Sequence, residues 1–188
     1  MNFRRLFVLT LLALAMAVPA LAEADVKTVP ESQAQTSPLT GTPLEPFIPF
    51  LGNWEVEAKW ANGEPIWARN EYEIGLGGKF VFARTWTKDG SGEAYERYQT
   101  YFGVDPDSQR VKTWGFTYDG TFAMVEDYEV TNEGGKPSFT SVWASGPAEI
   151  KQTVALIDAK SYAWKVWTRT AEGGEWQQIM DGVWKRKD

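Results

Sequence analysis

The sequence predicts an all-β protein, an antiparallel up-and-down meander barrel of about ten strands. Between Gly52 and Lys187, aromatic and β-branched residues alternate with polar ones, which is the pattern of strands with one buried face. Turn-forming pairs interrupt this pattern about every 10–15 residues. They include Asn62-Gly63, Asp89-Gly90, Asp119-Gly120 and Gly134-Gly135. No stretch keeps a 3.6-residue period, so no long helix is expected.

The first 22 residues have the three parts of a signal peptide. Arg4 and Arg5 form a basic start, residues 6–18 are apolar, and Ala20-Leu21-Ala22 is an A-x-A cleavage site. An uncleaved anchor is the alternative, but the apolar run is short for a span of about 20 residues. We therefore expect cleavage, export to the periplasm or beyond the cell, and no transmembrane segment afterwards.

Residues 23–46 have the composition of a disordered linker. Proline, serine, threonine and glutamine dominate, and there is no aromatic residue. Such a segment buries too little apolar surface to offset its ordering entropy. We expect a flexible tether or a surface arm, followed by one barrel domain over residues 47–188.

Within the predicted strands, the period of two assigns one set of side chains to the barrel interior. Each strand then has one apolar face, and closing the sheet buries those faces and removes the exposed edges. A two-sheet sandwich is the alternative; the short connections favour the meander. In chain order the predicted inner sets are Trp54, Val56, Ala58 and Trp60; Ile66, Ala68, Asn70, Tyr72 and Ile74; Phe80, Phe82, Arg84 and Trp86; Tyr98, Thr100 and Phe102; Trp114, Phe116 and Tyr118; Phe122, Met124, Glu126, Tyr128 and Val130; Ile150, Gln152, Val154 and Leu156; Tyr162, Trp164 and Val166; and Trp176, Gln178, Met180 and Trp184.

Composition excludes several classes of function. The chain has no Cys and no His, so it has no disulfide, no thiolate or imidazole metal site and no Ser-His-Asp or Cys-His machinery. A net charge of −6 argues against nucleic acid or an anionic membrane as a partner. No metal and no cofactor are predicted.

The two ends of the predicted barrel resemble a known superfamily. Gly52-Asn53-Trp54 opens the first strand, and Trp184-Lys185-Arg186 lies near the end of the last. This resembles the Gly-x-Trp pattern of the calycins, which include lipocalins, fatty-acid-binding proteins, avidins and nitrobindin-like barrels. The chain is most similar to bacterial secreted lipocalin-like domains of unknown function. The resemblance implies that Arg186 packs over Trp54 and closes that end. Nitrobindin-like barrels bind haem through a His, which is absent here, so that activity is not carried over.

Polar residues at predicted inner positions are the candidates for ligand contact. Arg84 is the first choice, because its planar fork matches a carboxylate or phosphate; pairing with Glu126 across the lumen is the alternative. The full predicted ligand-binding set is Arg84, Asn70, Glu126, Tyr128, Trp86, Trp114, Gln152 and Gln178. No residue is predicted to be catalytic.

These residues favour a barrel that holds a small apolar or amphipathic molecule in its lumen. Two alternatives remain open: a filled barrel with a structural or interaction role in the cell envelope, and a calycin-type isomerase or cyclase. The enzyme would have only Glu126, Asp127 and Tyr128 as acid/base groups. A cavity of about 300 Å³ or more favours ligand binding, and a deep carboxylate with a raised pKa favours the enzyme.

Three tryptophans, Trp67, Trp143 and Trp167, fall outside the predicted inner set. Exposed indoles on a strand surface stack on sugars or contact proteins. The alternative is that residues 23–50 cover them.

Overall fold

The computed structural model describes residues 36–170 and 173–188, with only the backbone for residues 122–127. The predicted signal peptide, residues 1–22, and residues 23–35 of the predicted linker lie outside the described residues. None of the helices in the described ranges is long and apolar enough to cross a membrane.

The described chain folds into eleven strands and two short 3-10 helices. In order they are η1 (Glu45–Phe50), β1 (Gly52–Lys59), β2 (Pro65–Gly75), η2 (Leu76–Gly78), β3 (Phe80–Lys88), β4 (Ala94–Val104), β5 (Val111–Thr117), β6 (Phe122–Asp127), β7 (Glu129–Glu133), β8 (Lys136–Ser145), β9 (Ala148–Asp158), β10 (Ser161–Thr170) and β11 (Gln177–Lys187).

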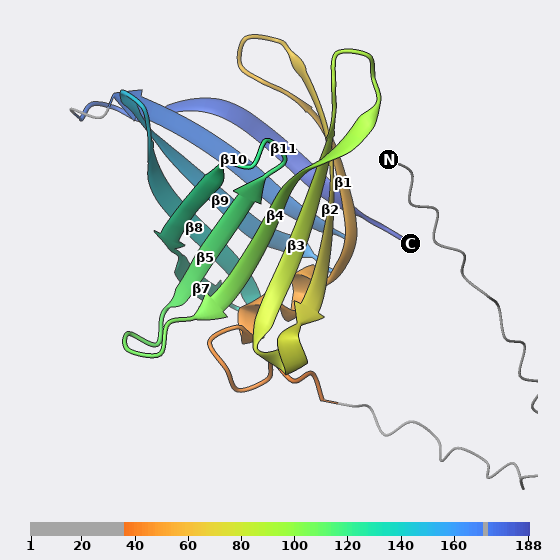
Figure 1. The fold of residues 1–188 in the computed structure, drawn as a ribbon, viewed down its shortest axis with the longest axis vertical. Coiled ribbons are helices and arrows are strands. Elements are labelled where there is room, and N and C mark those ends of the chain that lie inside the picture. Colours follow the sequence, from red (N-terminus) through yellow and green to blue (C-terminus); the bar gives the residue numbers. More distant parts are fainter. Residues whose placement is uncertain (1–35, 171–172) are drawn as a thin grey trace, which may run out of the picture. The chain divides into compact units, whose positions relative to one another are not determined.

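All strands belong to one antiparallel sheet in the order β6-β5-β4-β3-β2-β1-β11-β10-β9-β8-β7. The first and last strands pair, with Trp54 opposite Arg186, and the sheet curves round until β6 lies beside β8. Figure 1 shows the resulting nearly closed barrel. The all-β meander prediction is therefore confirmed. Residues 122–130 are predicted to form a single strand, the sixth. This segment is interrupted at Tyr128, which separates β6 from β7.

One end of the barrel is closed by the chain that precedes β1. Leu39, Leu44, Phe47 and Phe50 are buried, with exposed fractions of 0–2%. The Phe47 ring stacks on Phe139 with ring centres 4.3 Å apart. Figure 1 shows this segment, drawn in orange, below the strands.

The predicted linker is therefore wrong at its C-terminal end, because packing begins well before residue 47. Two isolated leucines supply the apolar anchors, and tight turns order the backbone between them. The amide nitrogens of Thr40, Thr42 and Glu45 donate to the carbonyl oxygens of Ser37, Leu39 and Thr42. Average composition does not reveal two well-placed leucines.

The predicted faces are correct for several strands and wrong for β3 and β5. Trp54 and Val56 in β1, and Tyr162 and Val166 in β10, are buried as predicted. In β3, Val81 and Ala83 are buried instead of Phe80 and Phe82. Both alternating sets of β3 are apolar, so period two alone does not identify the inner one. The large rings pack on the outer surface, where Phe82 stacks on Tyr101 at 4.6 Å.

The outer rings over β3, β4 and β5 meet above a glycine. Phe80 and Trp114 contact each other with ring centres 6.3 Å apart. A Cβ atom on Gly103 would lie 2.6 Å from Phe80, so glycine makes room for this pair. Trp114 and Phe116, predicted as inner, belong to this outer layer, whereas Val111 and Thr113 are the buried residues of β5.

Candidate functional site

The lumen of the barrel holds a cavity of about 1460 Å³. Its lining includes inner residues of β1–β4 and β8–β11, and the turn residues Asp89, Gly90 and Gly92 at the end away from η1. Figure 1 shows the β1–β2 and β3–β4 hairpins extended at the end away from η1. We call this end of the cavity the mouth. The volume is well above the threshold of about 300 Å³ for a small-molecule site.

Aromatic side chains form much of the cavity wall. They include Tyr72, Phe102, Tyr128, Trp143, Trp164 and Trp184. Tyr128 contacts Phe102 edge-on, with ring centres 5.6 Å apart. Trp67 and Trp143 both belong to the cavity lining, although the sequence predicts both to lie outside the inner set. A flat or polycyclic apolar molecule would find extensive ring surface here.

Asn70 provides a polar group toward the closed end of the cavity. It is only 9% exposed, and its Nδ2 donates to the hydroxyl oxygens of Tyr162 at 3.3 Å and Tyr72 at 3.5 Å. Within the described ranges, its Oδ1 has no hydrogen-bond partner. A buried polar atom without a partner is costly, so this carboxamide is a candidate contact for a ligand polar group.

The two phenols beside Asn70 stay neutral over the physiological range. Desolvation by burial raises the pKa of Tyr72 to about 12. The same cause raises the pKa of Tyr162 well above its usual value of 10.0. Asn70 and these phenols therefore form a neutral hydrogen-bonding cluster.

Gln152 and Tyr128 also line the cavity, as predicted. The Gln152 Oε1 accepts a hydrogen bond of 3.2 Å from the Trp164 Nε1, which fixes the indole against the lumen. Of the other predicted ligand contacts, Glu126 has no described side chain; its backbone pairs with Thr113 of β5.

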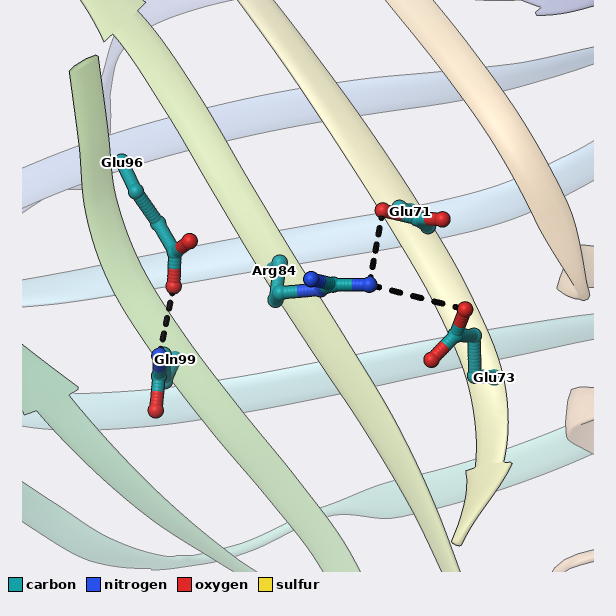
Figure 2. Close-up of polar contacts among 5 residues, drawn as sticks. All are labelled: Glu71, Glu73, Arg84, Glu96 and Gln99. Carbon is teal, nitrogen blue, oxygen red and sulfur yellow. Dashed lines mark hydrogen bonds and ion pairs between the residues drawn. The ribbon is translucent and has the colours of Figure 1, made fainter.

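Arg84 lies on the outer surface of the barrel, which corrects its predicted place in the lumen. Its Nη2 lies 3.1 Å from Glu71 and 3.5 Å from Glu73 on β2. Figure 2 shows Arg84 extending from β3 toward these two carboxylates, while Glu96 and Gln99 pair on β4. The predicted inner set of β3 is the outer one, so Arg84 pairs across strands with neighbouring carboxylates rather than across the lumen.

Three further predicted contacts are also outside the lumen. Trp86 shares the outer face of β3, where the Arg69 guanidinium lies 4.1 Å from the centre of its ring. Trp114 packs against Phe80. Gln178 is exposed and its Nε2 donates to Asp181, because a bulge between Val166 and Trp167 shifts the β10–β11 register next to it.

The closed end contains the predicted stack of Arg186 on Trp54. The guanidinium carbon lies 4.2 Å from the centre of the ring, and the Trp54 Nε1 donates to the Phe50 carbonyl oxygen at 2.6 Å. This end is fully packed, so a ligand would enter from the mouth.

Sequence reasoning missed Arg97 at the mouth of the cavity. Thr85 pairs with Tyr98 and Trp86 with Glu96, which leaves Arg97 as an extra residue in β4. This β-bulge lets two consecutive residues, Arg97 and Tyr98, line the cavity. The strict alternation used for prediction contains no signal for a bulge.

The described lining contains two carboxylates, Glu57 and Asp89. Hydrogen bonds from Ser91 lower the pKa of Asp89. This direction is the opposite of the raised carboxylate pKa expected for the isomerase or cyclase.

No protein-family model matches the chain, and no curated protein matches its sequence. The fold is similar to that of the S-type phycobiliprotein lyase CPES from Guillardia theta, with a TM-score of 0.52 and 11% identity over 84% of this chain and 99% of the lyase chain. A de novo designed fluorescence-activating β-barrel matches at a TM-score of 0.36 and 12% identity over 73% of this chain and 94% of its own. The redesigned barrel mFAP0, bound to DFHBI, matches at a TM-score of 0.38 and 8% identity over 73% of this chain and 99% of its own. At 11% identity, the likeness to the lyase shows the barrel fold alone.

Proposed function

We propose that this protein binds a small apolar or amphipathic ligand in the lumen of its barrel. The observation that carries the proposal is the cavity of about 1460 Å³, open at one end and lined by aromatic side chains. A barrel with a structural role would fill this space with side chains. Burial of the ligand's apolar surface would supply the affinity, at roughly 25 cal/mol per Å².

The neutral cluster of Asn70, Tyr72 and Tyr162 supports a role in orienting the ligand. Few but well-placed polar groups are typical of small-molecule sites. This cluster would have the ligand-orienting role that the sequence predicted for Arg84. A ligand whose inner end is apolar or weakly polar suits these groups, because a charge placed there would lose its hydration among neutral side chains.

Membership of the calycin superfamily and export from the cytoplasm are part of the same proposal. The barrel, the glycine at residue 52 and the Arg186–Trp54 stack support the family resemblance, and the signal-peptide pattern of residues 1–22 supports export. Export predicts a mature chain that starts at Glu23. Intact-mass measurement of the chain from a bacterial periplasm tests this start, and a retained N-terminus would contradict it.

Binding can be tested with N-phenyl-1-naphthylamine, a neutral fluorescent probe. We expect saturable enhancement of its fluorescence by the wild-type protein. Thr85 lines the cavity and is half-buried, so Thr85→Trp places an indole in the lumen and should weaken binding at least about tenfold. The matched control is Thr140→Trp, because Thr140 lies on the outer side of β8 and its hydroxyl pairs with that of Thr153.

Equal affinity of the two tryptophan variants, or no binding by the wild-type protein, would overturn lumen binding. Native mass spectrometry of the protein purified from its own host supplies a second readout. A co-purifying small molecule that is absent from Thr85→Trp but present in Thr140→Trp would identify the natural ligand.

A further inference from the structure

The mouth of the cavity carries three cationic side chains. Lys59, Lys88 and Arg97 are part of its lining. Within residues 36–170 and 173–188, no carboxylate forms an ion pair with any of them. The net charge of −6 repels anions at long range, so cations at the mouth would supply a local attraction for them.

Neighbouring side chains hold Arg97 without neutralising it. Its Nε donates to the Tyr98 hydroxyl at 2.7 Å, and its Nη1 donates to the Tyr95 hydroxyl at 3.1 Å. The Arg97 carbonyl oxygen accepts a bond of 2.9 Å from the Tyr118 amide, which anchors the bulged backbone. The Nη2 makes no hydrogen bond to any residue in the described ranges, and it remains a charged donor.

The lining also contains two carboxylates, Glu57 and Asp89, and among the described residues neither forms an ion pair with these cations. Asp89 Oδ1 accepts hydrogen bonds from the amide nitrogens of Ser91 and Glu93 and from the Ser91 hydroxyl. That carboxylate organises the β3–β4 turn. Lys88 is directed toward an indole, with its Nζ 4.6 Å from the centre of the Trp67 ring.

We propose that the ligand is an amphipathic anion, with its apolar body in the lumen and its carboxylate at the mouth on the guanidinium of Arg97. This inference rests on the proposed lumen-binding function and adds the chemical class and orientation of the ligand. A carboxylate toward Asn70 would be desolvated among neutral groups, which is costly. At the mouth it keeps part of its hydration and gains a charge-assisted hydrogen bond.

Two probes with the same tail and different heads test this orientation. Dodecanoate and 1-dodecanol would each be titrated against bound N-phenyl-1-naphthylamine to obtain their dissociation constants. In the wild-type protein dodecanoate should bind more tightly, and Arg97→Gln should weaken it about fivefold while 1-dodecanol changes by less than about twofold. Raising the salt concentration from about 0.05 M to about 0.5 M should weaken dodecanoate selectively.

The matched control is Arg69→Gln, which removes the same charge from the outer face of β2. Arg69 stacks on Trp86 and is absent from the cavity lining, so its loss should leave both dissociation constants unchanged. Equal effects of the two variants, or equal weakening of both probes by Arg97→Gln, would overturn the carboxylate site but leave lumen binding intact. Failure of all three compounds to bind the wild-type protein would overturn both proposals.

Discussion

Arg186 joins three segments of the closed end across the face of Trp54. Its guanidinium carbon lies 4.2 Å from the centre of that ring. The same group donates to the carbonyl oxygens of Ala159, Leu51 and Pro49 at 2.9, 2.6 and 2.6 Å. One side chain therefore connects the β9–β10 turn, the segment before β1 and the last strand, which explains how a sheet of short hairpins is sealed at one end.

Replacing Arg186 by lysine should destabilise the protein even though the charge is kept. A lysine ammonium cannot reproduce the planar fork that reaches three carbonyl oxygens and covers an indole. We expect the free energy of unfolding to fall by roughly 2–4 kcal/mol, measured by urea denaturation. Lys185→Met, at an exposed position of the same strand, is the control and should change it by less than about 0.5 kcal/mol. Equal free energies of unfolding for Arg186→Lys and Lys185→Met would show that the Arg186 guanidinium does not stabilise the closed end.

Gly52 is required beside Arg186 for two reasons. Its φ is +104°, and a Cβ atom there would lie 2.9 Å from the Arg186 Nη1. Gly52→Ala should therefore cost about 1–3 kcal/mol of stability. In a double-mutant cycle with Arg186→Lys the cost should be smaller, because the steric part disappears. Strictly additive effects in urea denaturation would show that only the backbone conformation matters.

The sequence predicts the barrel from local signals, and the resemblance to the calycins predicts the Arg186–Trp54 stack at the closed end. The glycine turns are short patterns with direct physical meaning, whereas the Gly-x-Trp start and the terminal arginine are meaningful together through the family resemblance. The faces of β1, β9 and β10 follow from alternation because only one face of each is strongly apolar. The inner positions of Asn70 and Gln152 follow in the same way.

The errors have two physical causes. β3 has apolar residues on both faces. Whether Val81 or Phe82 points inward is therefore decided by packing against other strands, which the sequence of β3 alone does not reveal. Arg97 becomes part of the mouth through a bulge, which adds one residue and changes the faces around it. These two features move the candidate charged contact from Arg84 to Arg97.

Truncating Leu44 tests whether the segment before η1 belongs to the core. Leu44 is 2% exposed, so Leu44→Ala should lower the free energy of unfolding by roughly 2–4 kcal/mol. Leu76 offers the matched control, because it is 71% exposed and its truncation should change stability by less than about 0.5 kcal/mol. If residues 36–46 were an unpacked linker, truncating Leu44 would change the free energy of unfolding as little as truncating Leu76.

Arg84→Met should leave ligand binding unchanged, because Arg84 lies outside the lumen. Its ion pairs with Glu71 and Glu73 are partly exposed, with the Arg84 side chain 32% accessible, so their loss should cost at most about 1 kcal/mol. The dissociation constants of N-phenyl-1-naphthylamine and dodecanoate should stay within about twofold of the wild-type values. A selective loss of dodecanoate affinity in Arg84→Met would show that Arg84 contributes to the binding site.

Alkaline pH should destabilise the protein through the two phenols beside Asn70. Burial raises the pKa of Tyr72 to about 12 and that of Tyr162 well above 10.0, so the folded state holds protons that the unfolded state has already released. Their contribution to stability is complete below pH 10 and declines as the pH rises toward 12, by up to about 1.4 kcal/mol per pH unit for each phenol.

Urea denaturation at several pH values between 9 and 12 measures this slope, and Tyr72→Phe should reduce it by the share of one phenol. Tyr118→Phe is the control, since Tyr118 is 66% exposed and its replacement should leave the slope unchanged. A slope unaffected by Tyr72→Phe would mean that Tyr72 ionises equally in the folded and unfolded protein, and that the cluster beside Asn70 is open to water.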